Sequence, residues 1–429
     1  MKALLLAAAA LIAAPACAET IAITGGTLAI GDGSRPIPNG TVVMRDGRIV
    51  AAGANVATPA GATVIDAHGK WIAAGLIGSL ASLGLVDGYG MPETNDATAP
   101  RSPFSAAIDV STAINAAGPQ FGVERASGVT RAFVAGAASN TIFGGLGALI
   151  DLAADAEPVT KPRAFELVEL GENASKTGGG SRPAANMLLR QALDAARDPS
   201  QVGGLSKDTL VSRADAAALR PVVEGRVPLL AHVERAADIL NALALRRDYP
   251  ALRLVLVGAS EGWLVADRIA AARVPVIAGG LTDLPGAFET LAATQSNVGR
   301  MVKAGVLVAV STVNSTGGGP RQAYLPQYAG NLVAVSKMPG ATGLDWGLAF
   351  AAITSRPAEV MGLGGDYGSL RAGRHADVVL WDGDPLELAS APVAVWIDGV
   401  AQPMTNRQIK LRDRYATPQE GALPKAYER

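Results

Sequence analysis

The chain has 429 residues, of which 49% are hydrophobic and 17% are charged, and its formal net charge is −1. This composition supports a large buried core and argues against a disordered chain. The near-neutral charge provides no basic surface, so we expect no nucleic-acid partner. The length fits one barrel-sized domain together with a smaller unit.

The N-terminus has the features of a secretory signal peptide. Lys2 precedes an apolar run over residues 3–12, and small residues at positions 16–18 form an A-x-A type cleavage site. The apolar run is shorter than a membrane-spanning helix. We therefore expect a signal peptide over residues 1–18, cleavage after Ala18 and an exported, periplasmic protein.

Cys17 is the only cysteine of the chain. A lipoprotein modified at Cys17 is the alternative, although Ala14 and Pro15 fit a lipobox poorly. After cleavage the protein would have no disulfide, no thiolate nucleophile and no cysteine-ligated metal. No second hydrophobic segment is long enough to cross a bilayer, so we expect no membrane span.

Short apolar runs separated by turn residues predict β-strands at both ends of the chain. The predicted strands cover residues 21–23, 41–44, 48–52, 64–67, 376–381 and 393–397, and Asp46-Gly47 forms a hairpin turn. We expect the segments 19–73 and 366–412 to assemble into one small composite β-sandwich. Residues 413–429 are then a polar C-terminal tail.

Residues 74–365 alternate predicted strands with predicted helices. The strands cover residues 128–135, 227–231, 253–257, 274–278 and 306–311, and the helices cover 184–197, 236–246, 264–272, 288–304 and 344–354. Such repeats predict an α/β fold with a parallel sheet, and the length fits a (β/α)8 TIM-type barrel. A doubly wound open sheet is the alternative, but no G-x-G-x-x-G follows the first strand.

Three glycine-rich segments interrupt this alternation. Residues 143–147 are predicted to be a tight loop, and residues 171–181 a flexible surface loop or, alternatively, a lid over the barrel mouth. Gly318, Gly319 and Arg321 follow the last predicted barrel strand. They form either a flexible loop or an anion-binding loop, whose backbone N–H groups would hold a phosphate or carboxylate.

Four segments resemble the amidohydrolase superfamily, near its imidazolonepropionase-like members. The sequences DAHGK at residues 66–70 and AGLI at 74–77 are similar to the family's entry to the first barrel strand. Residues 352–359 and 368–377 are similar to its T-x-x-P-A helix and its G-S-L-x-x-G-x-x-A-D return to the sandwich. The resemblance covers nearly the whole mature chain. It implies a composite sandwich on a (β/α)8 barrel and hydrolysis of non-peptide or dipeptide-like C–N bonds.

The resemblance also gives the positions of the family's metal ligands. The first-strand H-x-H falls on Leu80 and Ser82, and the eighth-strand Asp falls on Val313, so these ligands are lost. The sixth-strand histidine is absent as well. His232 matches the fifth-strand histidine, and it is the remaining candidate for a metal or substrate contact.

A catalytic zinc ion takes about three protein ligands, so His232 would need carboxylates beside it. Glu234, Glu261 and Asp283 are the candidates, as ligands or as catalytic groups, because they lie at or after the ends of predicted strands. Zinc is one candidate metal, but an oxygen-rich site with one histidine favours a harder metal such as manganese or magnesium. The alternative is that no metal binds, His232 is a structural relic and the carboxylates form salt bridges.

Residues 258–262 match the G-x-S-x-G pattern of serine hydrolases. A serine nucleophile needs a histidine base, and the other two histidines, His68 and His375, lie in turns outside the predicted barrel. We expect both to be ordinary surface residues, which argues against Ser260 as a nucleophile.

Two functions remain open. The first is an exported hydrolase of C–N bonds in which His232 binds metal with help from Glu234 or Glu261. The second is a non-catalytic relative that binds a small molecule, forms a homodimer or pairs with an intact amidohydrolase homologue. The lost ligands favour the second function on chemical grounds.

Overall fold

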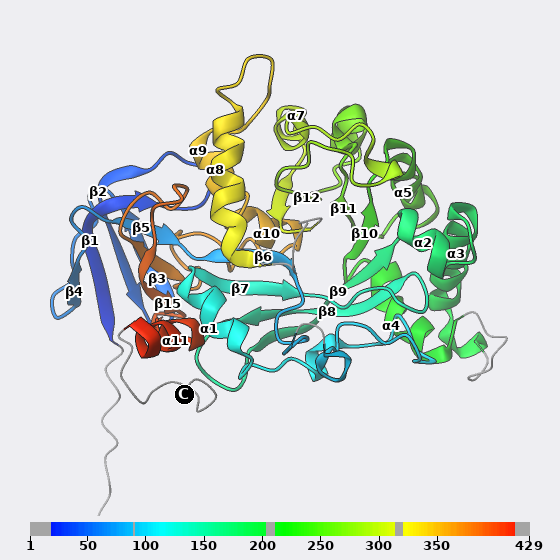
Figure 1. Cartoon of the computed structure of the whole chain (residues 1–429), viewed down its shortest axis with the longest axis horizontal. Coiled ribbons are helices and arrows are strands. Elements are labelled where there is room, and N and C mark those ends of the chain that lie inside the picture. Colours follow the sequence, from blue (N-terminus) through cyan, green and yellow to red (C-terminus); the bar gives the residue numbers. More distant parts are fainter. Residues whose placement is uncertain (1–18, 89–90, 203–210, 314–320, 417–429) are drawn as a thin grey trace, which may run out of the picture.

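The computed structural model describes residues 19–88, 91–202, 211–313 and 321–416. The predicted signal peptide with Cys17, the loop residues Gly318 and Gly319, and residues 417–429 of the predicted tail lie outside the described residues. Two eight-stranded sheets organise the chain, one at the left of Figure 1 and the other across its centre and right.

The first sheet is composite, because both ends of the chain contribute strands to it. Its order is β16-β15-β14-β5-β1-β2-β3, with β4 paired to β1. The strands are β1 (Thr20–Ala29), β2 (Ile37–Arg45), β3 (Arg48–Gly53), β4 (Thr63–Asp66), β5 (Trp71–Ala74), β14 (Val378–Trp381), β15 (Pro392–Ile397) and β16 (Val400–Ala401). The antiparallel pair β5–β14 joins the N-terminal and C-terminal segments, with Ala74 opposite Val378.

The second sheet forms the barrel, and its strands follow one another in sequence order. They are β6 (Leu76–Ala81), β7 (Val129–Val134), β8 (Phe143–Asp151), β9 (Val159–Glu169), β10 (Leu229–Val233), β11 (Leu254–Gly258), β12 (Val276–Gly279) and β13 (Val308–Ser311). At the seam between β6 and β13, the hydroxyl of Ser79 donates to the carbonyl of Val310 at 3.2 Å. This arrangement confirms a TIM-type barrel with a separate sheet domain.

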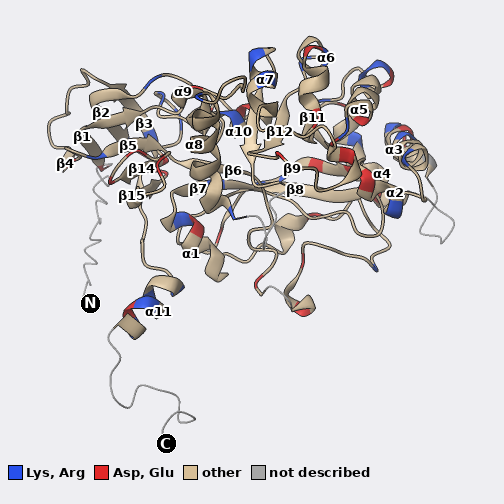
Figure 2. Cartoon of the chain, turned by 45° about the horizontal axis from the view of Figure 1, so that its top comes forward, with Lys and Arg blue, Asp and Glu red and all other residues tan. Residues whose placement is uncertain are grey.

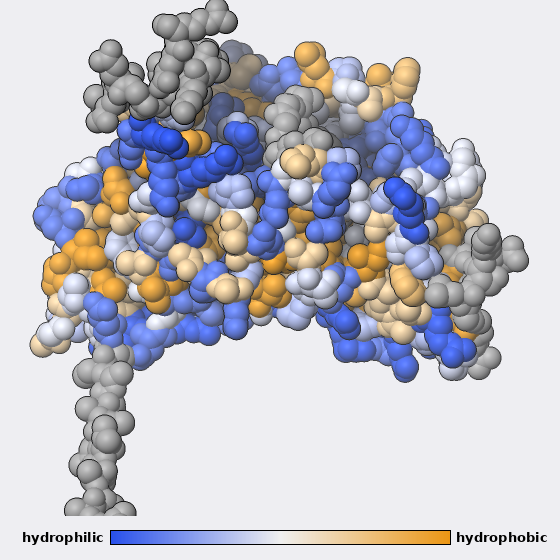
Figure 3. Space-filling view, turned by 60° about the horizontal axis from the view of Figure 1, so that its bottom comes forward, coloured by the Kyte–Doolittle hydropathy of each residue, from blue (hydrophilic) through white to orange (hydrophobic). Residues whose placement is uncertain are grey.

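Helices cover the barrel and its connections (Figure 1). They are α1 (Pro119–Ala126), α2 (Glu172–Thr177), α3 (Arg182–Arg197), α4 (Arg213–Val223), α5 (Ala236–Asp248), α6 (Ala266–Ala271), α7 (Asn297–Lys303), α8 (Leu325–Val335), α9 (Trp346–Ala351), α10 (Ser355–Val360) and α11 (Arg407–Ala416). Within the described ranges, no helix combines the length and the apolar character that crossing a membrane requires. The face in Figure 3 shows hydrophobic side chains mostly in small groups between hydrophilic ones.

The tight loop predicted over residues 143–147 is wrong, since these residues begin β8. β8 is antiparallel to both β7 and β9, so this part of the barrel is not built from β/α repeats. Gly147 of β8 allows close packing at this point, because a Cβ atom on Gly147 would lie only 2.1 Å from the ring of Phe165. Phe165 therefore fills the barrel interior against a strand that has no side chain at this position.

The helix predicted over residues 288–304 is also too long. A short 3-10 turn covers Phe288–Thr290, and α7 begins only at Asn297. Between these two segments the backbone of Ala292 forms hydrogen bonds with side chains. Its N–H donates to Glu261 at 3.2 Å, and its carbonyl accepts from the indole N–H of Trp263 at 2.8 Å. These tertiary hydrogen bonds take the place of the helical ones.

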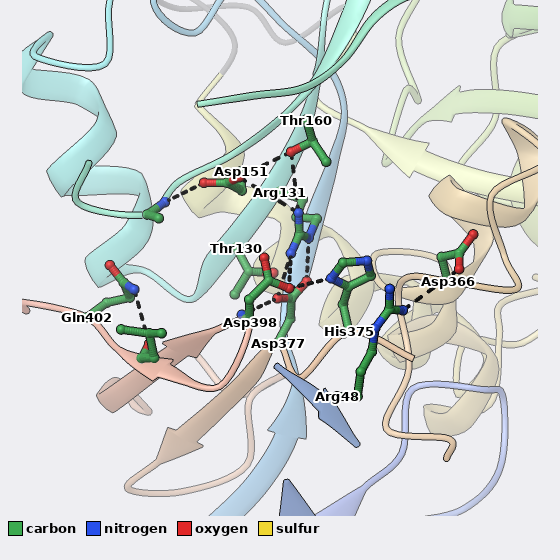
Figure 4. A network of polar contacts seen from close by, with 12 residues as sticks. Arg48, Thr130, Arg131, Asp151, Thr160, Asp366, His375, Asp377, Asp398 and Gln402 are labelled. Carbon is green, nitrogen blue, oxygen red and sulfur yellow. Dashed lines mark hydrogen bonds and ion pairs between the residues drawn. The ribbon is translucent and has the colours of Figure 1, made fainter. Parts of the chain in front are cut away.

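The interior face of the barrel is apolar along most of its length. Alternate residues of the strands point inward, and they form one buried cluster with Phe133 and Phe165 edge to face at 6.3 Å. At the end nearer the composite sheet, the interior instead holds the fully buried guanidinium of Arg131 on β7. Arg131 donates to both oxygens of Asp377, at 2.6 and 3.1 Å, and to Asp398 at 2.7 Å (Figure 4).

His375 belongs to this network, so its assignment as an ordinary surface residue is wrong. Its Nδ1 contacts a carboxylate oxygen of Asp398 (Figure 4). Its ring stacks on Tyr367 with 4.4 Å between the centroids. The guanidinium of Arg131 lies 4.6 Å from the centroid of the same Tyr367 ring. These contacts fasten the barrel to the composite sheet. His68, in contrast, is exposed.

Candidate functional site

A cavity of about 370 Å³ lies at the carboxyl ends of the barrel strands, the end where barrel enzymes carry their active sites. Of the sixteen described residues that line it, eleven are Ala, Gly, Leu or Val, so its walls are largely apolar. The five with polar side chains are Ser82, Glu169, Asn173, His232 and Thr312. A cavity with apolar walls and a few polar groups is typical of a small-molecule site.

The cavity brings together the positions that the family resemblance assigned to metal ligands. Leu80 and Ser82 line it from the end of β6, and Val313 lines it from beyond β13. His232 lines it from β10, where its side chain shares the interior face with Leu230. The structure thus places the predicted metal candidate beside the predicted lost ligands, around one space.

His232 is clamped between two glutamates. Its Nδ1 is 2.7 Å from Oε2 of Glu169, and its Nε2 is 2.9 Å from Oε1 of Glu234. The side chain of His232 is 22% exposed and that of Glu169 is 14% exposed, whereas that of Glu234 is only 2% exposed. Glu169 and His232 therefore face the cavity, and Glu234 lies behind the imidazole.

Backbone groups fix both carboxylates. The N–H of Gly171 donates to Oε1 of Glu169 at 2.9 Å, and the N–H of Ser260 donates to Oε2 of Glu234 at 2.8 Å. Gly258 turns the chain after β11 with a φ of +84°, and a Cβ atom there would lie 2.2 Å from Glu234. The absence of a side chain at Gly258 is therefore what allows Glu234 to reach His232.

The two glutamates determine the protonation of His232. Burial lowers the pKa of His232, but the charge and hydrogen bond of Glu169, and those of Glu234, outweigh this effect and raise it well above its ordinary value. These interactions favour the imidazolium form of the ring. In this state both nitrogen atoms are donors, and each has a glutamate as its acceptor.

A third glutamate lies nearby. Burial raises the pKa of Glu289, while the N–H of Glu172 and the charge of His232 partly offset this. Arg182 donates to Glu289 at 3.2 Å and pairs with Asp238 at 2.9 Å. In Figure 2, acidic residues, coloured red on the ribbon, lie near β9 and α2.

The other predicted site residues do not join the cavity. Glu261 accepts from the backbone N–H of Ala236 at 2.9 Å and from that of Ala292, so it holds the start of α5. Asp283 is exposed in the loop after β12, and Arg321 is exposed ahead of α8. None of the three is among the described residues that line the cavity. Of the predicted carboxylates, only Glu234 contacts His232.

Ser260 is not arranged as a nucleophile. Its backbone supports Glu234, and both nitrogen atoms of His232, the histidine at this mouth, are engaged with carboxylates. A serine nucleophile requires a histidine that can accept its proton. The G-x-S-x-G match therefore marks a tight turn rather than a catalytic elbow.

Sequence reasoning missed Glu169 and Asn173. Glu169 ends β9, a strand that was not predicted because residues 160–163 at its start are polar and exposed. Asn173 lies on α2, within the segment predicted to be a flexible loop or a lid. The flexible-loop prediction is wrong for residues 172–177, which are helical. Alternation of Phe165, Leu167 and Glu169 was the available signal for the strand.

The side chains present do not fit a hydrolytic metal site. Glu169 and Glu234 bind opposite nitrogen atoms of His232, so the three groups do not converge on one point. In the described part of the chain, no three His, Cys, Asp or Glu side chains form a group that could hold a metal ion. A catalytic zinc ion needs about three converging ligands and an open position for water.

Comparisons with known proteins agree with the fold. A model of the amidohydrolase family matches residues 232–401. Amidohydrolase tasK of Hapsidospora irregularis is 26% identical over 389 residues, and this chain, matched over 80% of its own length, spans 37% of that relative. An amidohydrolase from Thermotoga maritima MSB8 has a TM-score of 0.75 at 22% identity, covering 89% of this chain and 99% of its own.

Two further solved structures share the fold at lower similarity. A molinate hydrolase has a TM-score of 0.54 at 20% identity, covering 95% of this chain and 98% of its own. A prolidase bound to N-methylphosphonate-L-proline has a TM-score of 0.54 at 16% identity, covering 89% of this chain and 99% of its own. The family model thus makes the C-terminal part of the chain similar to the amidohydrolase family, and the solved structures show that the chain shares the fold of these proteins.

Proposed function

We propose that this chain is a non-catalytic amidohydrolase relative whose barrel mouth binds a small molecule without a metal ion. The main observation behind this proposal is that His232 is held between Glu169 and Glu234. Its two nitrogen atoms are 2.7 and 2.9 Å from oxygen atoms of these glutamates. The imidazolium supplies the positive charge between these carboxylates. The cavity with its apolar walls supplies the space for a ligand.

Hydrolysis of a C–N bond is the second candidate function. Solved structures of the same fold are named as a molinate hydrolase and a prolidase, and this favours it. Glu169 and His232 are the groups lining the cavity, within the described ranges, that could transfer a proton. In such a reaction Glu169 would act as a base and protonated His232 as an acid.

We also propose export to the periplasm, with cleavage after Ala18, on the basis of the N-terminal sequence. Pairing with an intact amidohydrolase homologue is a further proposal. It is supported by the loss of the family's metal ligands at Leu80, Ser82 and Val313. A homodimer remains the alternative assembly.

One experiment separates the two functions. The mature protein, with and without added zinc or manganese, is incubated with a panel of carbamates, dipeptides and cyclic amides, and the same compounds are tested for binding by ligand-observed NMR. Binding without turnover supports the proposal. Turnover that His232→Ala abolishes would replace it with the hydrolase function, and neither binding nor turnover would reject the barrel mouth as the functional site.

A further inference from the structure

We propose that the cavity at the barrel mouth selects a small apolar molecule carrying a primary or secondary ammonium group. This inference rests on the proposed function and adds the chemical class of the ligand. The apolar walls of the cavity favour a ligand whose larger part is apolar. Glu169 and His232, called the floor of the cavity below, favour a positively charged group at one end of that ligand.

The charge of the floor is negative in either protonation state of His232. The imidazole touches two carboxylates, those of Glu169 and Glu234. A protonated ring leaves one net negative charge, and a neutral ring leaves two. No lysine or arginine is among the cavity-lining residues of the described chain. A ligand carboxylate would therefore meet repulsion in a poorly hydrated space, and a cation would meet attraction.

Glu169 is the group that a cation would contact. Of the two clamping carboxylates it is the more exposed, at 14% against 2% for Glu234, and it lines the cavity. Within the described part of the chain, each of its oxygens accepts one hydrogen bond, Oε1 from Gly171 and Oε2 from His232. A carboxylate oxygen has two lone pairs, so Glu169 retains acceptor capacity toward the cavity.

The remaining polar groups favour an ammonium group with N–H bonds. Ser82, Thr312 and Asn173 line the cavity with oxygen atoms that can accept hydrogen bonds. No Phe, Tyr or Trp side chain lines it within the described ranges, so the aromatic cage that recognises quaternary ammonium groups is missing. A primary or secondary ammonium group can donate to Glu169 and to these neutral oxygens together.

The test compares three probes of similar shape: benzylamine, benzyl alcohol and benzoate. Their dissociation constants are measured by NMR titration on the mature protein, on Glu169→Gln and on Asp283→Asn. The Asp283 variant is the matched control, because it removes one exposed carboxylate from a loop at the same end of the barrel without touching the cavity. Thermal unfolding of each variant checks that the fold is intact.

We expect benzylamine to bind at least tenfold more tightly than benzyl alcohol, and benzoate to bind more weakly than both. Glu169→Gln should abolish the preference for the amine and leave the affinity for the alcohol within about threefold, whereas Asp283→Asn should change neither. Equal affinities for amine and alcohol, or an amine preference that survives Glu169→Gln, would overturn the inference and leave the binding function standing. No binding of any probe to the intact protein would overturn both.

Discussion

The backbone of Gly258 lies so close to the side chain of Glu234 that a Cβ atom on Gly258 would be 2.2 Å from Oε1 of Glu234. The same oxygen is 2.9 Å from Nε2 of His232. A glycine at the end of one barrel strand thus determines whether the carboxylate behind the cavity can hold the imidazole on the neighbouring strand. The relationship makes Gly258 the position from which the clamp can be opened without changing either of its charged partners.

Gly258→Ala should therefore disrupt the clamp. We expect the free energy of unfolding to fall by more than ~2 kcal/mol, since the new methyl group displaces Glu234 and the backbone is strained at a positive φ. Gly305→Ala is the matched control, because Gly305 has a φ of +88° and no described residue lies within 4 Å of an added Cβ atom. Chemical denaturation measures both variants, and equal losses would show that Glu234 does not need the space at Gly258.

The buried carboxyl group of Glu124 should make the stability of the protein depend on pH. Glu124 is buried on α1 and accepts from the backbone N–H of Ala323 at 2.7 Å, and burial raises its pKa to about 7. The folded state therefore holds this proton more tightly than the unfolded state does. Stability should fall as the pH rises from about 4.5 to about 7, by roughly 3 kcal/mol in total.

Glu124→Gln should remove this decline. Glutamine keeps an oxygen that can accept from Ala323 but does not ionise. The difference in unfolding free energy between the variant and the parent, measured at several pH values, should shift in favour of the variant between pH 4.5 and 7. A difference that stays constant over this range would mean that Glu124 is not protonated in the folded protein.

The buried carboxyl group of Glu166 leads us to expect that an apolar substitution at this position stabilises the protein. Glu166 is fully buried on β9, and among the described residues neither of its carboxyl oxygens has a hydrogen-bond partner. Burial, and then the negative charge of Asp215, raise its pKa well above the ordinary value. Replacing an unpaired buried carboxyl with an apolar side chain of similar size removes its desolvation penalty.

We expect Glu166→Met to raise the free energy of unfolding at pH 8 by about 2 kcal/mol. Glu166→Gln is the control, since it removes the ionisable proton but keeps a buried polar group, and its gain should be smaller. Denaturant titrations at one pH measure both. A loss of stability in Glu166→Met would show that Glu166 has a structural role that its contacts do not reveal.

We expect the substitution Arg131→Met to cause a large loss of stability. Arg131 is fully buried between Asp377 and Asp398, and Arg131→Met would remove the guanidinium group that pairs with both carboxylates. Removing one partner of a buried ion pair costs about 3–5 kcal/mol. Arg220→Met is the control, because its pair with Glu224 lies on the surface of α4 and should matter little. Similar unfolding free energies for the two variants would contradict this account of the network.

Most of the fold could be predicted from the sequence, because the signals were strong where the strands are buried and separated by helices. The strand from Leu229 to Val233 and the helix after it are examples. β8 and β9 were not predicted, since β8 begins with glycines and β9 begins with exposed polar residues. Their antiparallel pairing also departs from the β/α alternation on which the prediction relied.

The site was predictable only in part, for the same reason. His232 could be found because it follows an apolar strand and matches a family position. Glu169 could not, since it belongs to a strand that was not recognised and meets His232 across 63 residues of sequence. The geometry of the clamp depends on a tight turn at Gly258 and on the register between β9 and β10, which sequence patterns do not specify.

The metal content of the purified mature protein tests the central claim most directly. Metal per chain is measured by mass spectrometry after incubation with zinc and manganese and removal of the unbound ions, with His232→Ala treated in parallel. The clamp on His232 predicts the same substoichiometric metal in both proteins. One metal ion per chain in the parent and none in His232→Ala would contradict it, and would show that His232 leaves Glu169 and Glu234 to bind a metal.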